Sequence, residues 1–127
     1  MTVKDILVSA LLFVVIDSFY LTSMTPHFTR MVMTIQKSPL KLNLIYTVIV
    51  YLFLVGGLYY FALRHRGKKS INELSLQAGI LGLVIYGVYD FTNIAIFKDW
   101  DLMGSIIDTI WGFILHASTV YLTLRLF

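Results

Sequence analysis

The sequence predicts an all-α fold, namely an integral membrane bundle of four transmembrane helices. The chain has 127 residues, of which 58% are hydrophobic and only 13% are charged, and its mean hydropathy is +0.82. A soluble domain has about 25% charged residues. Four weakly charged runs are each long enough to cross a ~30 Å hydrocarbon core as a helix, which takes about 20 residues. Because the backbone must satisfy its own hydrogen bonds in lipid, runs of this length and uniformity are helical.

The expected helices cover about residues 6–24, 42–63, 74–97 and 102–124, and residues 1–127 form a single transmembrane domain. The second span has no charged residue, the first and third have one aspartate each, and the fourth has Asp108 and His116. A cleaved secretory signal is not expected, because Asp17 follows the first apolar stretch and no A-x-A-like site is present. The connections are too short to fold alone, so the protein acts in the bilayer or at its surface.

A short interfacial helix is expected between the first two spans. Thr25-Pro26 is a good N-cap and first-turn pair, and Ser38-Pro39 would end the helix. Its apolar residues recur at helical spacing and form one face: Phe28, Met31, Val32 and Ile35. Such a face is typical of a helix that lies in the membrane interface. A linker held by the interface is favoured over a gating lid.

The basic residues are distributed unevenly between the two ends of the expected bundle. The side with both termini has Lys4, Arg64, Arg66, Lys68, Lys69 and Arg125, against Arg30, Lys37, Lys41 and Lys98 opposite. The positive-inside rule therefore favours cytoplasmic N- and C-termini. The net charge of +3 comes with no basic patch interleaved with aromatic residues, so nucleic acid is not an expected partner, and the absence of cysteine excludes disulfides and thiolate chemistry.

Three aspartates lie inside the expected spans at a similar depth. Asp17, Asp90 and Asp108 are each six or seven residues from the external end of their span. That spacing places each acid roughly 10 Å below the external end. A charged residue at mid-helix costs about 2.5–3.5 kcal/mol on insertion scales, so each acid needs a partner, a proton or water. Three such residues at one level indicate a common pocket.

Polar and aromatic residues accompany these acids at helical spacing. Gly82 and Gly112 lie in the same stripes, and glycines let helix backbones approach closely, so the stripes should face the bundle interior. The second span, with no charge, is expected to act as a supporting wall. The candidate ligand- or ion-binding residues are Asp17, Tyr20, Tyr86, Asp90, Asn93, Asp108 and Trp111.

The chemistry available to this set is limited. No phosphate-binding loop, nucleophile elbow, zinc pair or dinucleotide fingerprint is present. Carboxylates, phenols and an indole can transfer protons, bind hard cations or hydrogen-bond polar lipid groups. The acids could instead serve only as interhelical hydrogen-bonding groups. For any single acid this interpretation is as favoured as a functional role, but for three acids at one level it is less favoured. His116, nearer the cytoplasmic side, is expected to be a packed residue and not a ligand.

Several motifs in the chain resemble a known family. A Y-G-x-Y-D-x-T-N run extends from Tyr86 to Asn93, Trp100 follows, and D-x-x-W-G begins at Asp108. With Asp17 and the aromatic residue downstream of it, this pattern resembles the small membrane-protein family catalogued as domain of unknown function 2177, over nearly the whole chain. The resemblance implies a four-helix architecture and the same acids, but no established activity.

Three functions from different classes are compatible with the sequence. The leading hypothesis is an externally facing pocket that binds or translocates protons or a small cation. The alternative is a membrane-embedded acid/base enzyme acting on a lipid or isoprenoid, which would need an apolar groove beside the acids. The third is a non-catalytic assembly protein. Membrane lipids are expected partners, whereas cofactors, catalytic residues, any metal and homo-oligomer formation are left open.

Overall fold

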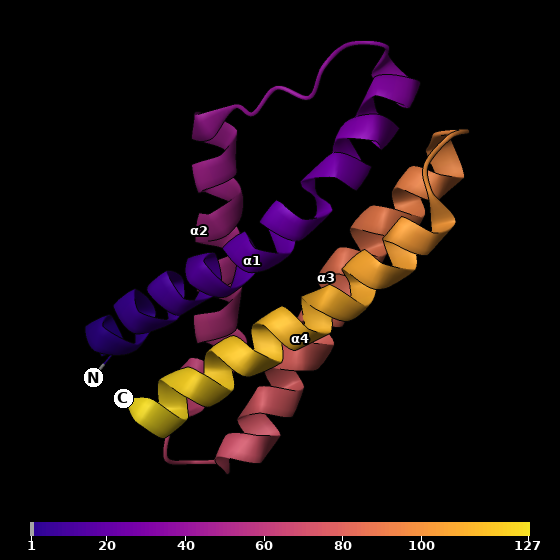
Figure 1. Cartoon of the computed structure of the whole chain (residues 1–127). Coiled ribbons are helices and arrows are strands. Elements are labelled where there is room, and N and C mark those ends of the chain that lie inside the picture. Colours follow the sequence, from indigo (N-terminus) through magenta and orange to yellow (C-terminus); the bar gives the residue numbers. More distant parts are fainter. Residues whose placement is uncertain (1) are drawn as a thin grey trace.

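The computed structural model describes residues 2–127 and consists of four long helices (Figure 1). They are α1 (Thr2–Gln36), α2 (Leu44–Phe61), α3 (Ile71–Ile96) and α4 (Leu102–Leu126), with a short 3-10 turn, η1 (Leu63–His65), after α2. Each long helix is long and apolar enough to span a membrane. The predicted all-α, four-span fold is thereby confirmed, and the bounds of the last three spans differ from those expected by only a few residues.

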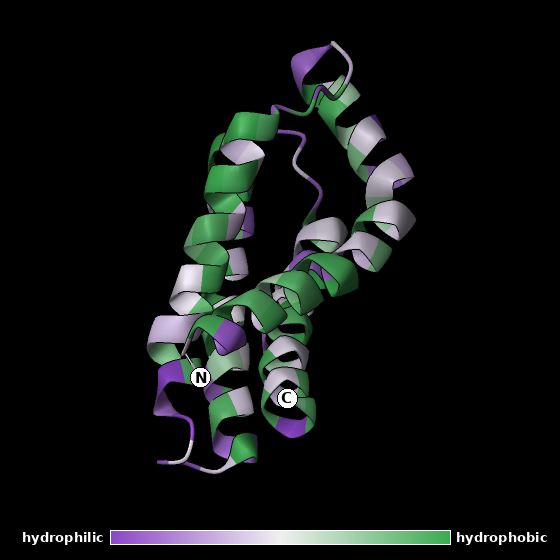
Figure 2. Ribbon diagram, turned by 90° about the vertical axis from the view of Figure 1, so that its left-hand side faces the viewer, coloured by the Kyte–Doolittle hydropathy of each residue, from purple (hydrophilic) through white to green (hydrophobic). Residues whose placement is uncertain are grey.

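The first helix is longer than expected, because the backbone stays helical through Pro26. The segment predicted as a separate interfacial helix is helical, but it continues the first span without a break, so Thr25-Pro26 is not a cap. Proline has no N–H, which removes one hydrogen bond and bends a helix without necessarily ending it. The Thr25 hydroxyl donates to the Leu21 carbonyl at 2.5 Å, a bond that also favours bending. Figure 2 shows the axis of α1 turning along its length.

Helices α3 and α4 form the most closely packed pair, and glycines determine how near they approach. A Cβ atom added to Gly112 would lie 2.6 Å from the Gly82 carbonyl oxygen, and one added to Gly82 would collide with the Gly112 carbonyl. Neither position has room for a side chain. The glycine stripes therefore face the bundle interior, as predicted.

The two chain termini and the α2–α3 hairpin meet at one end of the molecule, called here the terminal end (Figure 1). Asp5 accepts two hydrogen bonds from the Arg66 guanidinium, at 2.9 Å from Nε and 2.8 Å from Nη2. Arg66 also donates to the Thr123 carbonyl at 3.4 Å, so α1, the hairpin and α4 are joined. Both termini lie on one side, as expected, and the assignment of that side to the cytoplasm stays a prediction.

The apolar core fills the half of the bundle nearer the terminal end. Phe13, Leu58, Leu115 and Val120 are fully buried there. Outside this core most large hydrophobic side chains are exposed on the helix surfaces, and Figure 2 shows the hydrophobic colour along the helices and the hydrophilic colour at their ends. That distribution is the one expected of helices surrounded by lipid.

Candidate functional site: an acid cluster next to an apolar cavity

Asp17 on α1 is buried and is held by two neutral donors. Its Oδ2 accepts a hydrogen bond from the Tyr51 hydroxyl of α2 at 2.6 Å, and its Oδ1 accepts one from the Trp111 indole of α4 at 3.0 Å. Only 5% of Asp17 is exposed. Each carboxyl oxygen therefore has a donor, and three helices are joined at this residue.

Asp108 on α4 is linked to the same network through an aromatic pair. The Tyr20 hydroxyl donates to Asp108 Oδ1 at 2.8 Å. The Tyr20 ring stacks on Trp111, with ring centroids 4.7 Å apart and an interplanar angle of 7°. Because Trp111 also donates to Asp17, the stacked pair connects the two acids across α1 and α4.

Asp90 on α3 lies beside Asp108. The two carboxyl groups line one cavity of about 270 Å³. Asp90 is only 2% exposed, and its Oδ2 atom has no hydrogen-bond donor among the described residues. A buried carboxyl oxygen without a donor is costly. Among the described residues, Asp90 Oδ2 is thus the carboxyl oxygen of the cluster that is buried without a hydrogen bond.

The outer segment of α1, residues 25–36, covers this small cavity. Three of its lining residues come from this segment: Phe28, Met31 and Val32. The sequence predicted that this apolar stripe would lie in the membrane interface, but these three residues face the acids. His27 Nε2 lies 3.0 Å from Asp101 Oδ2, without hydrogen-bond geometry, so the outer segment of α1 contacts the residue that caps α4.

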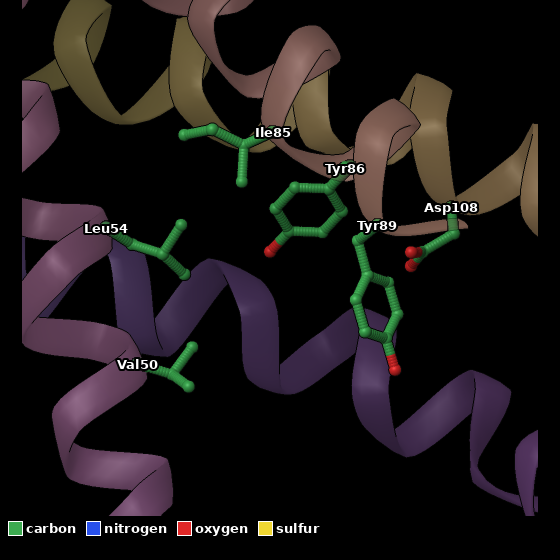
Figure 3. A pocket seen from close by; sticks show the side chains of 6 residues that line it. All are labelled: Val50, Leu54, Ile85, Tyr86, Tyr89 and Asp108. Carbon is green, nitrogen blue, oxygen red and sulfur yellow. The ribbon is translucent and has the colours of Figure 1, made fainter. Parts of the chain in front are cut away.

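A second, apolar cavity lies between α2 and α3 and also reaches Asp108. It has a volume of about 350 Å³, and Figure 3 shows the side chains that line it: Val50, Leu54, Ile85, Tyr86, Tyr89 and Asp108. Asp108 is the only charged residue of this lining and also belongs to the lining of the smaller cavity. The acid cluster thus borders directly on a space whose other walls are aliphatic and aromatic.

His116 lies deeper, toward the apolar core, and is fully buried. Its Nδ1 is 2.8 Å from the Gly112 carbonyl, so Nδ1 carries the hydrogen and donates. The ring packs edge-on against Phe13 and Tyr86. This environment is that of a packed residue. Among the described residues no three His, Asp or Glu side chains converge on a point that could hold a metal ion.

The structure brings six of the seven candidate residues together: Asp17, Tyr20, Tyr86, Asp90, Asp108 and Trp111. Among the described residues, Asn93 neither lines one of the two cavities nor hydrogen-bonds to any of these six. Sequence reasoning missed Tyr51, because the second span was interpreted as an inert wall. The sequence did contain a sign of this role. Tyr51 is a polar residue in the middle of an apolar span, far from the membrane interfaces where tyrosines usually lie.

Comparison with protein-family models shows the family to which this chain belongs. The model of the family described as "Predicted membrane protein (DUF2177)" matches residues 2–124. The chain belongs to the DUF2177 family. The resemblance carried by the Tyr86–Asn93 run and by the motif at Asp108 is therefore confirmed. No curated protein and no solved structure matches this DUF2177 chain.

Proposed function

We propose that this DUF2177 protein is a membrane-embedded acid/base site for a lipid or isoprenoid. The polar group of the ligand lies at Asp90 and Asp108, and its hydrocarbon chain lies in the apolar cavity between α2 and α3. One observation carries the proposal: Asp108 lines both the small cavity shared with Asp90 and the apolar cavity of about 350 Å³. A carboxyl group at the end of an apolar space matches an amphiphile better than a simple ion.

The chemistry follows from the two neighbouring carboxyl groups. Two adjacent negative charges in a buried site repel each other strongly, and one proton shared between Asp90 and Asp108 removes that cost. The protonated partner then donates to the polar group of the ligand, while the ionised partner accepts a proton. The Tyr20 hydroxyl, which donates to Asp108, holds that carboxyl in position. This arrangement needs only the residues of the chain itself.

The packing below the acids favours this function over passage of an ion across the bundle. Phe13, Leu58 and Leu115 are fully buried between the acids and the terminal end. The polar side chains buried in the same region bond to carbonyls of their own helices and not to one another: Ser9, His116, Thr119 and Thr123. A translocation path would need a continuous polar file through this region. A lipid, in contrast, reaches the apolar cavity sideways, between α2 and α3.

Retention of lipid by the purified protein tests the proposal. The wild-type chain and the Asp90→Asn and Asp108→Asn variants would be extracted in mild detergent and examined by native mass spectrometry. We expect one amphiphile class retained by the wild type and depleted at least tenfold in both variants. Asp99→Asn, an exposed carboxyl in the α3–α4 connection, is the matched control and should retain the wild-type amount. Equal lipid content in all four proteins would contradict the proposal.

Binding of protons or a small cation is the second candidate, and Asp90 Oδ2 is the observation that favours it. This buried oxygen has no donor among the described residues and stands next to Asp108. If this candidate holds, uptake or current in proteoliposomes will be abolished by Asp90→Asn while lipid retention stays unchanged. Transport that is unaffected by Asp90→Asn and Asp108→Asn would rule it out.

A further inference from the structure

A second site of different chemistry lies at the terminal end of the bundle, away from the acid cluster. Six of the ten Lys and Arg residues are at this end, and four of them belong to the hairpin between α2 and α3: Arg64, Arg66, Lys68 and Lys69. Within the described part of the chain, only Arg66 among these four has an ion-pair partner, Asp5. Lys68 and Lys69 are exposed and form no ion pair among the described residues.

The hairpin forms one wall of a cavity of about 350 Å³. Arg66, Gly67, Lys69 and Ser70 supply its polar rim. Gly67 has a φ of 82°, a backbone conformation that favours glycine, and the turn it makes lets Arg66 and Lys69 pair through their backbones. Two cationic residues are therefore placed on the same wall by the fold of the hairpin.

The start of α3 adds further positive character to this rim. The helix begins at Ile71, and the Ser70 hydroxyl already accepts from the Glu73 N–H at 3.1 Å. The remaining N–H groups of a helix's first turn are unpaired within the helix and attract anions. Here the helix start is next to Lys69, which has no ion-pair partner among the described residues, and to Arg66, whose charge is balanced by Asp5. The same first turn also has one acidic residue, Glu73.

The inner part of the same cavity is apolar. Its lining residues there are Ile71, Leu74 and Leu124, from the first turn of α3 and the last turn of α4. Apolar side chains contribute nothing to the binding of a free inorganic anion. They do contribute to the binding of a phospholipid, because its phosphate contacts the rim while the first carbons of its acyl chains contact the aliphatic side chains. The ends of transmembrane helices also lie at the level of the headgroups.

We propose that this cavity binds the phosphate group of an anionic phospholipid, with Lys69 and the start of α3 as the principal phosphate contacts. Arg66 contributes less, since its Nε and one terminal nitrogen are already bonded to Asp5. The site does not depend on the function proposed for the acid cluster, because it shares no residue with either cavity at the acids.

Native mass spectrometry of the full chain, titrated with phosphatidylglycerol or with phosphatidylcholine, tests this site. We expect wild-type protein to bind phosphatidylglycerol several-fold more tightly than phosphatidylcholine, and Lys69→Gln to weaken phosphatidylglycerol binding roughly fivefold, as expected for one basic residue at a membrane surface. Lys69→Arg should retain the preference. Lys98→Gln, an exposed lysine at the opposite end, is the matched control and should leave the preference unchanged.

Three results would overturn the proposal. One is equal affinity for the two lipids, and another is the same loss in Lys69→Gln and Lys98→Gln. The third separates a lipid from a free anion: if millimolar inorganic phosphate displaces phosphatidylglycerol completely, the cavity is a phosphate site and the lipid chains do not contribute. Failure of any of these tests leaves the acid cluster untouched, because Asp90 and Asp108 are unchanged in every variant.

Discussion

Tyr51 on α2 donates a hydrogen bond of 2.6 Å to Asp17 on α1, and this is the bond by which the otherwise loosely packed helix α2 is attached to the acid cluster. Tyr51→Phe removes the donor and leaves Asp17 with Trp111 alone. We expect a loss of about 1 kcal/mol in the free energy of unfolding, as for other hydrogen bonds between membrane helices.

Unfolding in mixed detergent micelles measures this effect. Tyr46→Phe is the matched control, because Tyr46 is on the same helix and is 67% exposed. Equal stability of the two phenylalanine variants would show that the Tyr51–Asp17 bond contributes nothing to the fold.

The Asp5–Arg66 pair predicts a larger effect at the terminal end. The Asp5 side chain is only 6% exposed, so Arg66→Gln leaves a buried carboxylate without its cation. Removing one partner of such a pair lowers the free energy of unfolding by about 3–5 kcal/mol. The loss is smaller here because Arg66 is partly exposed to solvent. The double variant Asp5→Asn/Arg66→Gln should recover part of this loss, because no unpaired charge remains. A double variant as unstable as Arg66→Gln alone would contradict the interpretation.

Close approach of α3 and α4 predicts that Gly112→Ala is poorly tolerated. The new methyl group would lie 2.6 Å from the Gly82 carbonyl oxygen, which is backbone and cannot rotate away. Separation of the two helices should cost about 1–3 kcal/mol, the usual cost of overpacking, and the same chemical unfolding experiment measures it. Gly56→Ala serves as the control because nothing lies within 4 Å of its added Cβ. Wild-type stability for Gly112→Ala would show that the helices are farther apart.

The outer segment of α1 should be held over the acids by His27. His27→Ala removes the contact with Asp101, which is 3.0 Å away. Amide hydrogen exchange in residues 27–36 should then become faster, while exchange in α3 stays the same. The measurement is hydrogen–deuterium exchange by mass spectrometry, with His65→Ala in the hairpin as the control. Unchanged exchange in residues 27–36 would mean that the apolar contacts of Phe28 and Met31 suffice.

The spans were predictable from the sequence because lipid leaves the backbone few alternatives, so apolar length alone specifies a helix. The continuity of α1 could not be predicted from the sequence, because Thr25-Pro26 has the local chemistry of a helix start. Packing of Met31, which is 8% exposed, against the bundle stabilises the longer helix instead. Local sequence signals describe what a segment can do alone, whereas this helix depends on contacts made by α4 and its connection.

The acids were identified from depth, and the structure gathers Asp17, Asp90 and Asp108 as that argument expected. The partners were harder to predict. Tyr51 reaches Asp17 only because α2 is rotated to present it, and a span without charge has no pattern that defines this rotation. Asn93 was placed in the stripe by its i+3 spacing from Asp90, yet it lines neither cavity. Helical spacing shows which residues share a face of a helix, but it does not show how many of them contact the neighbouring helices.

The proposed function requires a ligand whose hydrocarbon chain lies in the apolar cavity and whose polar end is at Asp108. Photocrosslinking from α2 tests this most directly. A diazirine amino acid would replace Val50, which lines the same cavity as Asp108. In a second protein it would replace Val48, which lines an apolar cavity of about 510 Å³ between α1 and α2 whose lining includes no carboxyl group. After bulk lipid is removed in detergent, we predict one amphiphile class crosslinked at position 50, lost on Asp108→Asn, and no such adduct at position 48. The same adducts at both positions, unaffected by Asp108→Asn, would contradict the account.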